Sequence, residues 1–155
     1  MRPSALAFMT ALTLSGCIVV PVPLPGPQVD RSVARPDPST VAANDVNAYR
    51  RAAGVAPVAR SAALDRAAAR HARDMNRNDF MDHRGTDGSS HSDRIRAVGC
   101  PGGAENVADG PYTRQSVMQA WMESPGHRRN ILNSRMTRWG LAQSGDKWAM
   151  VLSPC

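Results

Sequence analysis

Half of the prolines in this chain lie in one short stretch, and this clustering limits where a folded domain can be. Six of the 12 prolines fall between Ile18 and Pro38, where the sequence shows no amphipathic period. Proline fixes φ and cannot donate a backbone hydrogen bond, so such a stretch favours an extended chain. We therefore expect a tether over residues 17–39 and one folded domain over residues 40–155, since a domain usually has roughly 100 to 200 residues.

The segment before the tether is typical of a secretory signal. Arg2 precedes the apolar run Ala5–Leu14, which is too short to span a bilayer. The run ends in Leu14-Ser15-Gly16-Cys17, which resembles the lipobox of bacterial lipoprotein precursors. We expect residues 1–16 to be a signal peptide and Cys17 to carry the lipid that anchors the protein to the membrane. An uncleaved membrane helix and a soluble secreted protein are the alternatives left open.

These features predict an exported protein of the cell envelope. Ile18, which follows the predicted lipidated residue, lacks the acidic character associated with inner-membrane retention in some diderm bacteria. In such an organism we expect the outer membrane or a periplasm-facing location. An extended tether rises about 3.1 Å per residue, so the domain could lie up to roughly 60 Å from the bilayer.

The charge pattern argues against nucleic acid as a partner. The net charge of +6 comes from 18 arginines and one lysine spread along the chain. Proteins that bind nucleic acid usually gather basic residues on one element with aromatic residues between them. The nearest approach to this pattern has no aromatic residues and consists of Arg66, Arg70, Arg73 and Arg77. We expect no nucleic-acid partner, and the sequence does not indicate the oligomeric state.

Apolar residues at helical spacing predict a mainly helical first half of the domain. The spacing is most regular in an alanine-rich run, where Leu64, Ala68, His71 and Met75 share one face. His71 is therefore expected in the core. Ser90 and Asp93 have the spacing of a capping box. The predicted helices lie between Thr40 and Ala53, around Leu64–Met75, and over Ser90–Val98, Gln115–Glu123 and Pro125–Leu132.

Strand signals are short and come late in the chain. They cover Ala104–Ala108, Thr137–Ala142 and Lys147–Leu152, and the last two form a predicted hairpin. Helices before and between such strands predict an α+β domain with a small, mainly antiparallel sheet.

Cys100 and Cys155 remain in the domain if Cys17 is lipidated. In an oxidising compartment such a pair predicts a disulfide, and two free thiols are the alternative. Closing a loop of 55 residues would stabilise the fold by about 4 kcal/mol.

Several stretches of the domain, in order, resemble one family. They are VNAYRRAAGVAPV, LDRAAARHARDM, HRGTDGSSHSDRI, GGAENVADG, WMESPGHRRNIL and WGLA, and together they cover Val46 to Leu152. The chain resembles bacterial members of the CAP superfamily (cysteine-rich secretory protein, antigen 5, pathogenesis-related). The resemblance implies an α-β-α sandwich with a shallow cleft lined by two histidines and one or two glutamates.

Carried over by position, the cleft residues are His83, Glu105 and His127. Animal and plant members commonly have a second glutamate three residues after the tryptophan that corresponds to Trp121, where this chain has Ser124. Glu123 lies one position away. Whether Glu123 replaces the missing acid is left open by the sequence.

The three residues allow two kinds of chemistry. His83 and His127 are candidate ligands for Zn²⁺, and Glu105 would then be a third ligand or a general base. His127 would be the third residue of a helix, whose positive end favours a neutral ring. The alternative is a hydrogen-bonded cluster that stiffens the cleft. We expect His91, in the first turn of a polar helix, to be solvated.

The leading hypothesis is a lipid-anchored envelope protein that binds a small apolar or ionic ligand, such as a lipid or a metal ion, or a partner, in the His83, Glu105 and His127 cleft. A Zn-dependent hydrolase or peptidase is the second hypothesis, with Glu105 as general base. A purely structural envelope protein is the third. We expect a binding protein more than an enzyme by analogy with the family, and the sequence has no serine or cysteine nucleophile motif.

Overall fold

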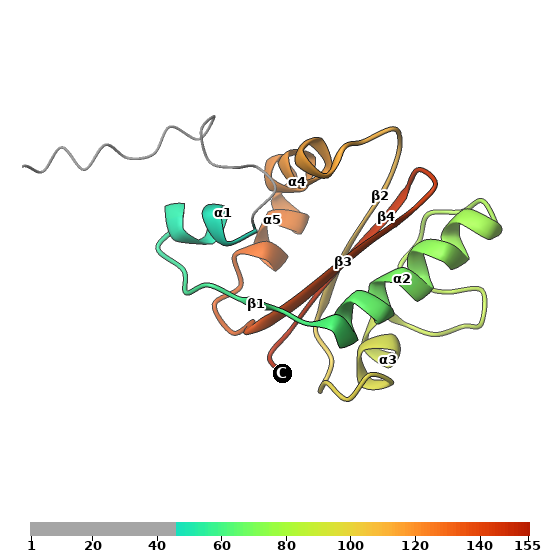
Figure 1. Cartoon of the computed structure of the whole chain (residues 1–155), viewed down its shortest axis with the longest axis horizontal. Coiled ribbons are helices and arrows are strands. Elements are labelled where there is room, and N and C mark those ends of the chain that lie inside the picture. The colour runs from blue at the N-terminus through green and yellow to red at the C-terminus, as the bar shows by residue number, and fades with distance from the viewer. Residues whose placement is uncertain (1–45) are drawn as a thin grey trace, which may run out of the picture. The chain divides into compact units, whose positions relative to one another are not determined.

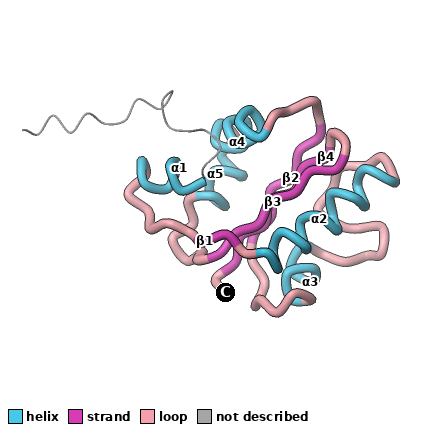
Figure 2. Tube along the Cα trace, viewed as in Figure 1, coloured by secondary structure: helices cyan, strands magenta, loops and turns pink. Residues whose placement is uncertain are grey.

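The computed structural model describes residues 46–155. The predicted signal, Cys17, the tether and the start of the first predicted helix lie outside the described residues. The helices are α1 (Val46–Ala52), α2 (Ala62–Arg77), α3 (His91–Arg96), α4 (Arg114–Glu123) and α5 (Pro125–Ile131). The strands are β1 (Ala59–Arg60), β2 (Ala104–Asp109), β3 (Arg138–Ser144) and β4 (Lys147–Ser153), as Figure 2 shows.

The strands form one sheet in the order β1-β3-β4-β2. The β3–β4 hairpin and the β2–β4 pair are antiparallel, and only the two-residue strand β1 runs parallel to its neighbour. The predicted mainly antiparallel sheet is confirmed. Strand β1 was not predicted. Two residues are too few to show the alternation of apolar and polar residues that indicates a strand, and they form one only by pairing with β3.

Helices cover both faces of the sheet. Along β4, Trp148, Met150 and Leu152 belong to a core cluster with α4 and α5, whereas Ala149 and Val151 belong to a second cluster with α2. Successive residues of a strand point to opposite faces, so this alternation buries β4 on both sides. Figure 1 shows α2 and α3 on one side of the sheet and α1, α4 and α5 on the other. The α-β-α sandwich is confirmed.

Helix α2 has the buried face that its sequence predicts. Leu64, Ala68, His71 and Met75 are fully buried. Ser61 caps the helix by accepting a hydrogen bond from the backbone N–H of Leu64. The predicted capping box of α3 is also confirmed, with Ser90 and Asp93 bonded reciprocally.

A disulfide joins Cys100 and Cys155, as predicted. It connects the end of the chain after β4 with the segment that leads into β2. Among residues 46–155, the helices are all too short or too polar to cross a membrane.

Candidate functional site

The site is built around Glu105, which lies on the edge strand β2 and has a buried carboxylate. His83 comes from the loop between α2 and α3, and its Nδ1 lies 3.0 Å from Glu105 Oε1. A carboxylate can only accept, so His83 donates from Nδ1 and its Nε2 is left for another partner. The His83 side chain is 51% exposed. The structure therefore joins a buried acid to an accessible imidazole.

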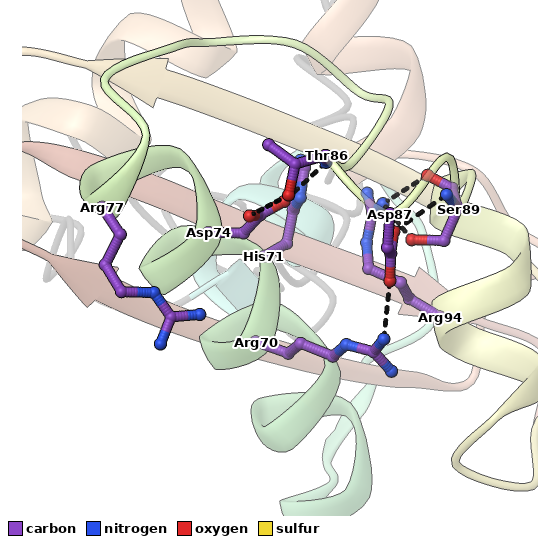
Figure 3. Close-up of a pocket in the computed structure, with 8 residues that line it drawn as sticks. All are labelled: Arg70, His71, Asp74, Arg77, Thr86, Asp87, Ser89 and Arg94. Atoms are coloured by element: carbon purple, nitrogen blue, oxygen red, sulfur yellow. Dashed lines mark hydrogen bonds and ion pairs between the residues drawn. The ribbon is translucent and has the colours of Figure 1, made fainter.

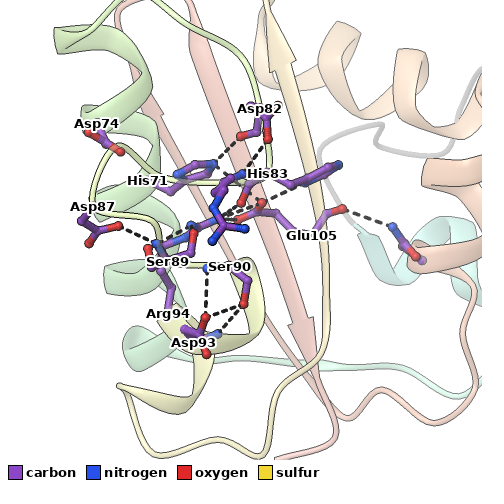
Figure 4. A network of polar contacts seen from close by, with 12 residues as sticks. His71, Asp74, Asp82, His83, Asp87, Ser89, Ser90, Asp93, Arg94 and Glu105 are labelled. Atoms are coloured by element: carbon purple, nitrogen blue, oxygen red, sulfur yellow. Dashed lines mark hydrogen bonds and ion pairs between the residues drawn. The ribbon is translucent and has the colours of Figure 1, made fainter.

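Arg94, on α3, neutralises this buried acid. Its Nη2 lies 3.0 Å from Glu105 Oε1 and 2.9 Å from Oε2, and both side chains are almost completely buried. The same guanidinium donates to the backbone oxygens of His83 and Ser89, each at 2.9 Å. Arg94 thus holds the acid and the His83 loop together (Figure 4).

His71, on α2, is the third side chain that lies close to Glu105. Its Nε2 donates to the backbone oxygen of Asp82 at 2.7 Å and lies 3.7 Å from Glu105 Oε1. Burial lowers the pKa of His71, despite the opposing effect of Glu105. The prediction of a core histidine is confirmed. The helical periodicity did not predict that His71 also lies close to Glu105.

The hydrogen bond between His83 and Glu105, together with the charge of Arg94, shifts the pKa values of His83 and Glu105. Burial alone would raise the pKa of Glu105, but the hydrogen bond from His83 and the charge of Arg94 hold that pKa below its usual value. The hydrogen bond to Glu105 raises the pKa of His83 above 6.5. Glu105 is therefore a stable anion and a weak proton acceptor.

His127 approaches the site from the other layer of the sandwich. Asn106 Nδ2 donates to the backbone oxygen of His127 at 3.2 Å, and Asn130 Nδ2 donates to Asn106 Oδ1 at 2.8 Å and to the backbone oxygen of Glu105 at 3.2 Å. These bonds fix α5 against β2. Burial lowers the pKa of His127, and the charge of nearby His83 lowers it further.

The structure thus places the three predicted residues around β2 but does not join them all. Within the described residues no hydrogen bond links the His127 ring to Glu105. His91 comes closer than expected, because its ring centroid lies 6.0 Å from that of His83. The candidate ligand atoms of His83, His91 and Glu105 lie within 4.8 Å of one another. His91 is half-buried rather than fully solvated.

Glu123, the neighbour of the family position, lies at the end of α4. Its side chain is exposed and accepts a hydrogen bond from Gln119, one turn earlier on α4, at 3.0 Å. Ser124, which occupies the family position, lines a cavity instead.

This cavity lies beside His127 and has a volume of about 280 Å³. Two of its lining side chains, Met81 and Tyr112, are the large apolar residues that remain exposed in the described part of the chain, at 53% and 36%. Trp121 is also part of the lining, and its Nε1 donates to the backbone oxygen of Val107. The complete lining is Met81, Val107, Ala108, Asp109, Tyr112, Ala120, Trp121, Ser124 and His127.

Arg94, Asn106 and Asn130 were not selected from the sequence alone. Arg94 is one of 18 arginines, and nothing in its neighbours marks it as buried. The two asparagines lie inside the stretches AENVA and HRRNIL that carry the family resemblance. That position in the motifs was a signal that could have identified them.

Comparisons with known proteins agree with this fold. A family model described as the cysteine-rich secretory protein family, CAP, matches residues 43–150. The uncharacterized protein YkwD of Bacillus subtilis is 33% identical over 121 residues, covering 72% of this chain and 47% of YkwD. The chain therefore spans about half the length of this curated relative.

Solved structures share the fold. An extracellular protein with an SCP domain from Bacillus anthracis superposes with a TM-score of 0.68 at 23% identity, over 71% of this chain and 38% of that one. An outer surface protein of Borrelia burgdorferi gives a TM-score of 0.63 at 17% identity, over 70% of this chain and 85% of that one. The family model covers more than half of the sequence, and the chain belongs to the cysteine-rich secretory protein (CAP) family.

Proposed function

We propose that this protein is an exported, lipid-anchored binding module of the cell envelope, whose cleft holds a small ligand with an apolar body and a polar end. The observation that carries the proposal is the cavity of about 280 Å³ with exposed Met81 and Tyr112 on its lining and His127 beside them. Large apolar side chains left exposed around a concave site are typical of ligand binding.

The polar end of the ligand would lie near the imidazoles. Burial and His83 lower the pKa of His127, so its ring is neutral and can donate or accept one hydrogen bond. His83 is accessible, and its Nε2 has no hydrogen-bond partner among residues 46–155. Asp109 is the acid of the lining, and its carboxylate is already paired with Lys147 at 2.6 Å, so it adds little free negative charge to the cavity.

Export and anchoring remain part of the proposal. They rest on the predicted signal peptide and Cys17, and the described relatives include one extracellular and one outer surface protein. Changing Cys17→Ser should move the protein from the membrane fraction to the soluble fraction of the cell. An unchanged distribution would argue against lipidation.

The cavity can be tested with anilinonaphthalene sulfonate, a fluorescent probe with an apolar body and one charged end. The full chain should enhance its fluorescence, and Ala120→Leu, which fills part of the cavity, should weaken binding about tenfold. Ala62→Leu adds the same side chain at an exposed position of α2 and is the control. Equal binding by both variants, with unchanged circular dichroism, would contradict the proposal.

A second candidate function is the binding of a cation such as Zn²⁺. The observation that favours it is the hydrogen bond from His83 Nδ1 to Glu105, because a carboxylate that orients a histidine in this way commonly supports a metal ligand. The side chains present supply some, but not all, of the ligands that Zn²⁺ would need. His83 offers Nε2 and His127 is the expected second ligand, but both oxygens of Glu105 are bound by Arg94. Glu105 would then orient a ligand rather than bind the metal itself.

Thermal unfolding with added Zn²⁺ tests this candidate. Zn²⁺ should raise the Tm of the full chain, and His83→Ala should remove the rise, whereas its exposed neighbour Arg84→Ala should keep it. His127→Ala and His91→Ala identify the second imidazole. A Tm that does not respond to Zn²⁺ would refute the cation site and leave the apolar cavity untouched.

The hydrolase hypothesis draws less support from the geometry. A general base should take up a proton near neutral pH, but Arg94 and His83 keep the pKa of Glu105 low. Turnover of a peptide or ester substrate, abolished by Glu105→Asp, would restore the hypothesis.

A further inference from the structure

Helix α2 presents a row of four arginines to solvent. Arg66, Arg70, Arg73 and Arg77 follow one another at intervals of four, three and four residues, which places them on one line along the helix. All four are exposed, and the buried residues of α2 lie on the opposite side. At 1.5 Å per residue the row extends roughly 16 Å. We call these four residues the α2 arginine row.

The charge of this row is mostly not neutralised. Arg70 Nη2 lies 2.6 Å from Asp87 Oδ2. Within residues 46–155 the side chains of Arg66, Arg73 and Arg77 have no ion pair or hydrogen bond. Like charges three and four residues apart repel and weaken a helix, whereas alternating charges would support it. The row therefore costs stability, which a negatively charged partner would restore.

A polar pocket of about 200 Å³ opens beside the row, and Arg70 and Arg77 belong to both (Figure 3). The pocket lies on the α2 side of the sheet, away from the cavity at His127. Its complete lining is Arg70, His71, Asp74, Arg77, Thr86, Asp87, Ser89 and Arg94.

Two buried side chains of the pocket have unused hydrogen-bonding atoms. His71 Nδ1 and Arg94 Nε are buried and without a partner among the described residues. His71 donates from Nε2, so its Nδ1 is an acceptor, whereas Arg94 Nε is a donor. Buried polar atoms are rarely left unpaired. The lining also contains Asp74, whose carboxylate already accepts hydrogen bonds from Thr86 and Asn78. The exposed guanidinium groups of Arg70 and Arg77 can donate to a phosphate.

We propose that the α2 arginine row and this pocket form a docking surface for a membrane of anionic phospholipid whose headgroup carries hydroxyl groups, as phosphatidylglycerol does. A flat layer of headgroup phosphates can contact all four arginines at once, and one headgroup can enter the pocket. The row has no aromatic side chains on which bases could stack, which disfavours a nucleic acid. This surface is additional to the proposed ligand cavity and does not depend on it.

The test uses the full chain with Cys17→Ser, so that a lipid anchor cannot account for binding. Sedimentation with vesicles of phosphatidylglycerol and phosphatidylcholine is compared with sedimentation with phosphatidylcholine alone. One triple variant carries Arg66→Gln, Arg73→Gln and Arg77→Gln. The control carries Arg128→Gln, Arg129→Gln and Arg135→Gln, which removes the same charge from exposed positions in and just after α5.

We expect binding to the phosphatidylglycerol vesicles only. Each arginine near an anionic surface contributes about fivefold, so the α2 variant should bind roughly 100-fold more weakly and the control only a few-fold more weakly. Equal losses in the two variants would show that net charge alone acts, and would overturn the docking surface. Circular dichroism checks that both variants are folded.

A second comparison tests the pocket. Phosphatidylserine has the same net charge as phosphatidylglycerol, but an ammonium and a carboxylate replace the hydroxyl groups. The protein should bind phosphatidylglycerol vesicles more tightly. Equal affinity for both lipids would refute the role of the pocket. Tighter binding to soluble polyphosphate than to either vesicle would replace the membrane with a soluble polyanion and overturn the proposal.

Discussion

Glu105 keeps its charge inside the protein because of three neighbouring side chains. Arg94 supplies a full positive charge, His83 donates a hydrogen bond, and His71 lies 3.7 Å from the same oxygen. A charge buried without such partners would be strongly unfavourable. The same residues that define the candidate site therefore also hold the loop before α3 to the sheet.

Replacing Glu105 with glutamine should destabilise the fold by about 3–5 kcal/mol, because Arg94 is left as a buried charge without a partner. Urea unfolding measures this change. Glu123→Gln is the matched control, since Glu123 is exposed and its replacement should change stability by less than about 0.5 kcal/mol. A similar, small effect of both substitutions would show that the ion pair does not contribute.

The two candidate site histidines should titrate on opposite sides of pH 6.5. The hydrogen bond to Glu105 raises the pKa of His83, whereas burial and the charge of His83 lower the pKa of His127. His83 thus stabilises the fold below pH 6.5, and this contribution is lost as the pH rises through its raised pKa. His127 contributes above pH 6.5 and loses its contribution as the pH falls. NMR titration of the ring protons measures both values, and the reverse order would contradict the assigned contacts.

At the scale of elements, the fold depends on how closely α2 approaches β3. Gly140 lies on β3, and a Cβ atom there would overlap the backbone of Leu64 and Asp65. Asp65 also accepts a hydrogen bond from the Leu141 backbone N–H at 2.9 Å. Glycine at this position is required by the close contact of helix and strand, not by its φ angle.

Gly140→Ala should therefore destabilise the protein by about 3 kcal/mol, since neither backbone can move without disturbing the sheet. Gly126→Ala is the control. Gly126 lies in α5, where an added Cβ would meet only Arg129 at 3.9 Å and alanine is the better helix former. Thermal unfolding should rank Gly126→Ala as equal to or above the natural protein, and a tolerated Gly140→Ala would contradict the packing described.

At the scale of the whole molecule, the disulfide closes a loop of 55 residues. Cys100 and Cys155 are separated by 55 residues that include β2, α4, α5 and the β3–β4 hairpin. Reduction, or the double change Cys100→Ser and Cys155→Ser, should lower stability by about 4 kcal/mol. Urea unfolding with and without reductant measures the difference. A reductant-insensitive midpoint in the natural chain would argue against the bond.

The sequence by itself determined the elements of this protein and much of its family site. The periodicity of α2, the capping box of α3, the β3–β4 hairpin and the pairing of Cys100 with Cys155 follow from the local chain or from cysteine number. The family motifs pointed to His83, Glu105 and His127. The periodicity, the capping box and the hairpin depend on residues close in the sequence, and the cysteine pair and the motifs are recognised by residue type, so folding is not needed to identify them.

Only the tertiary structure decided how these residues meet. Nothing local selects Arg94 from the other arginines or brings His91 to the ring of His83. These contacts arise where α3 and the loop before it pack against the edge strand β2, across 11 to 22 residues of chain for Glu105. The physical reason is that a buried charge selects its partners by position in space, which the packed sandwich sets and the sequence pattern does not record.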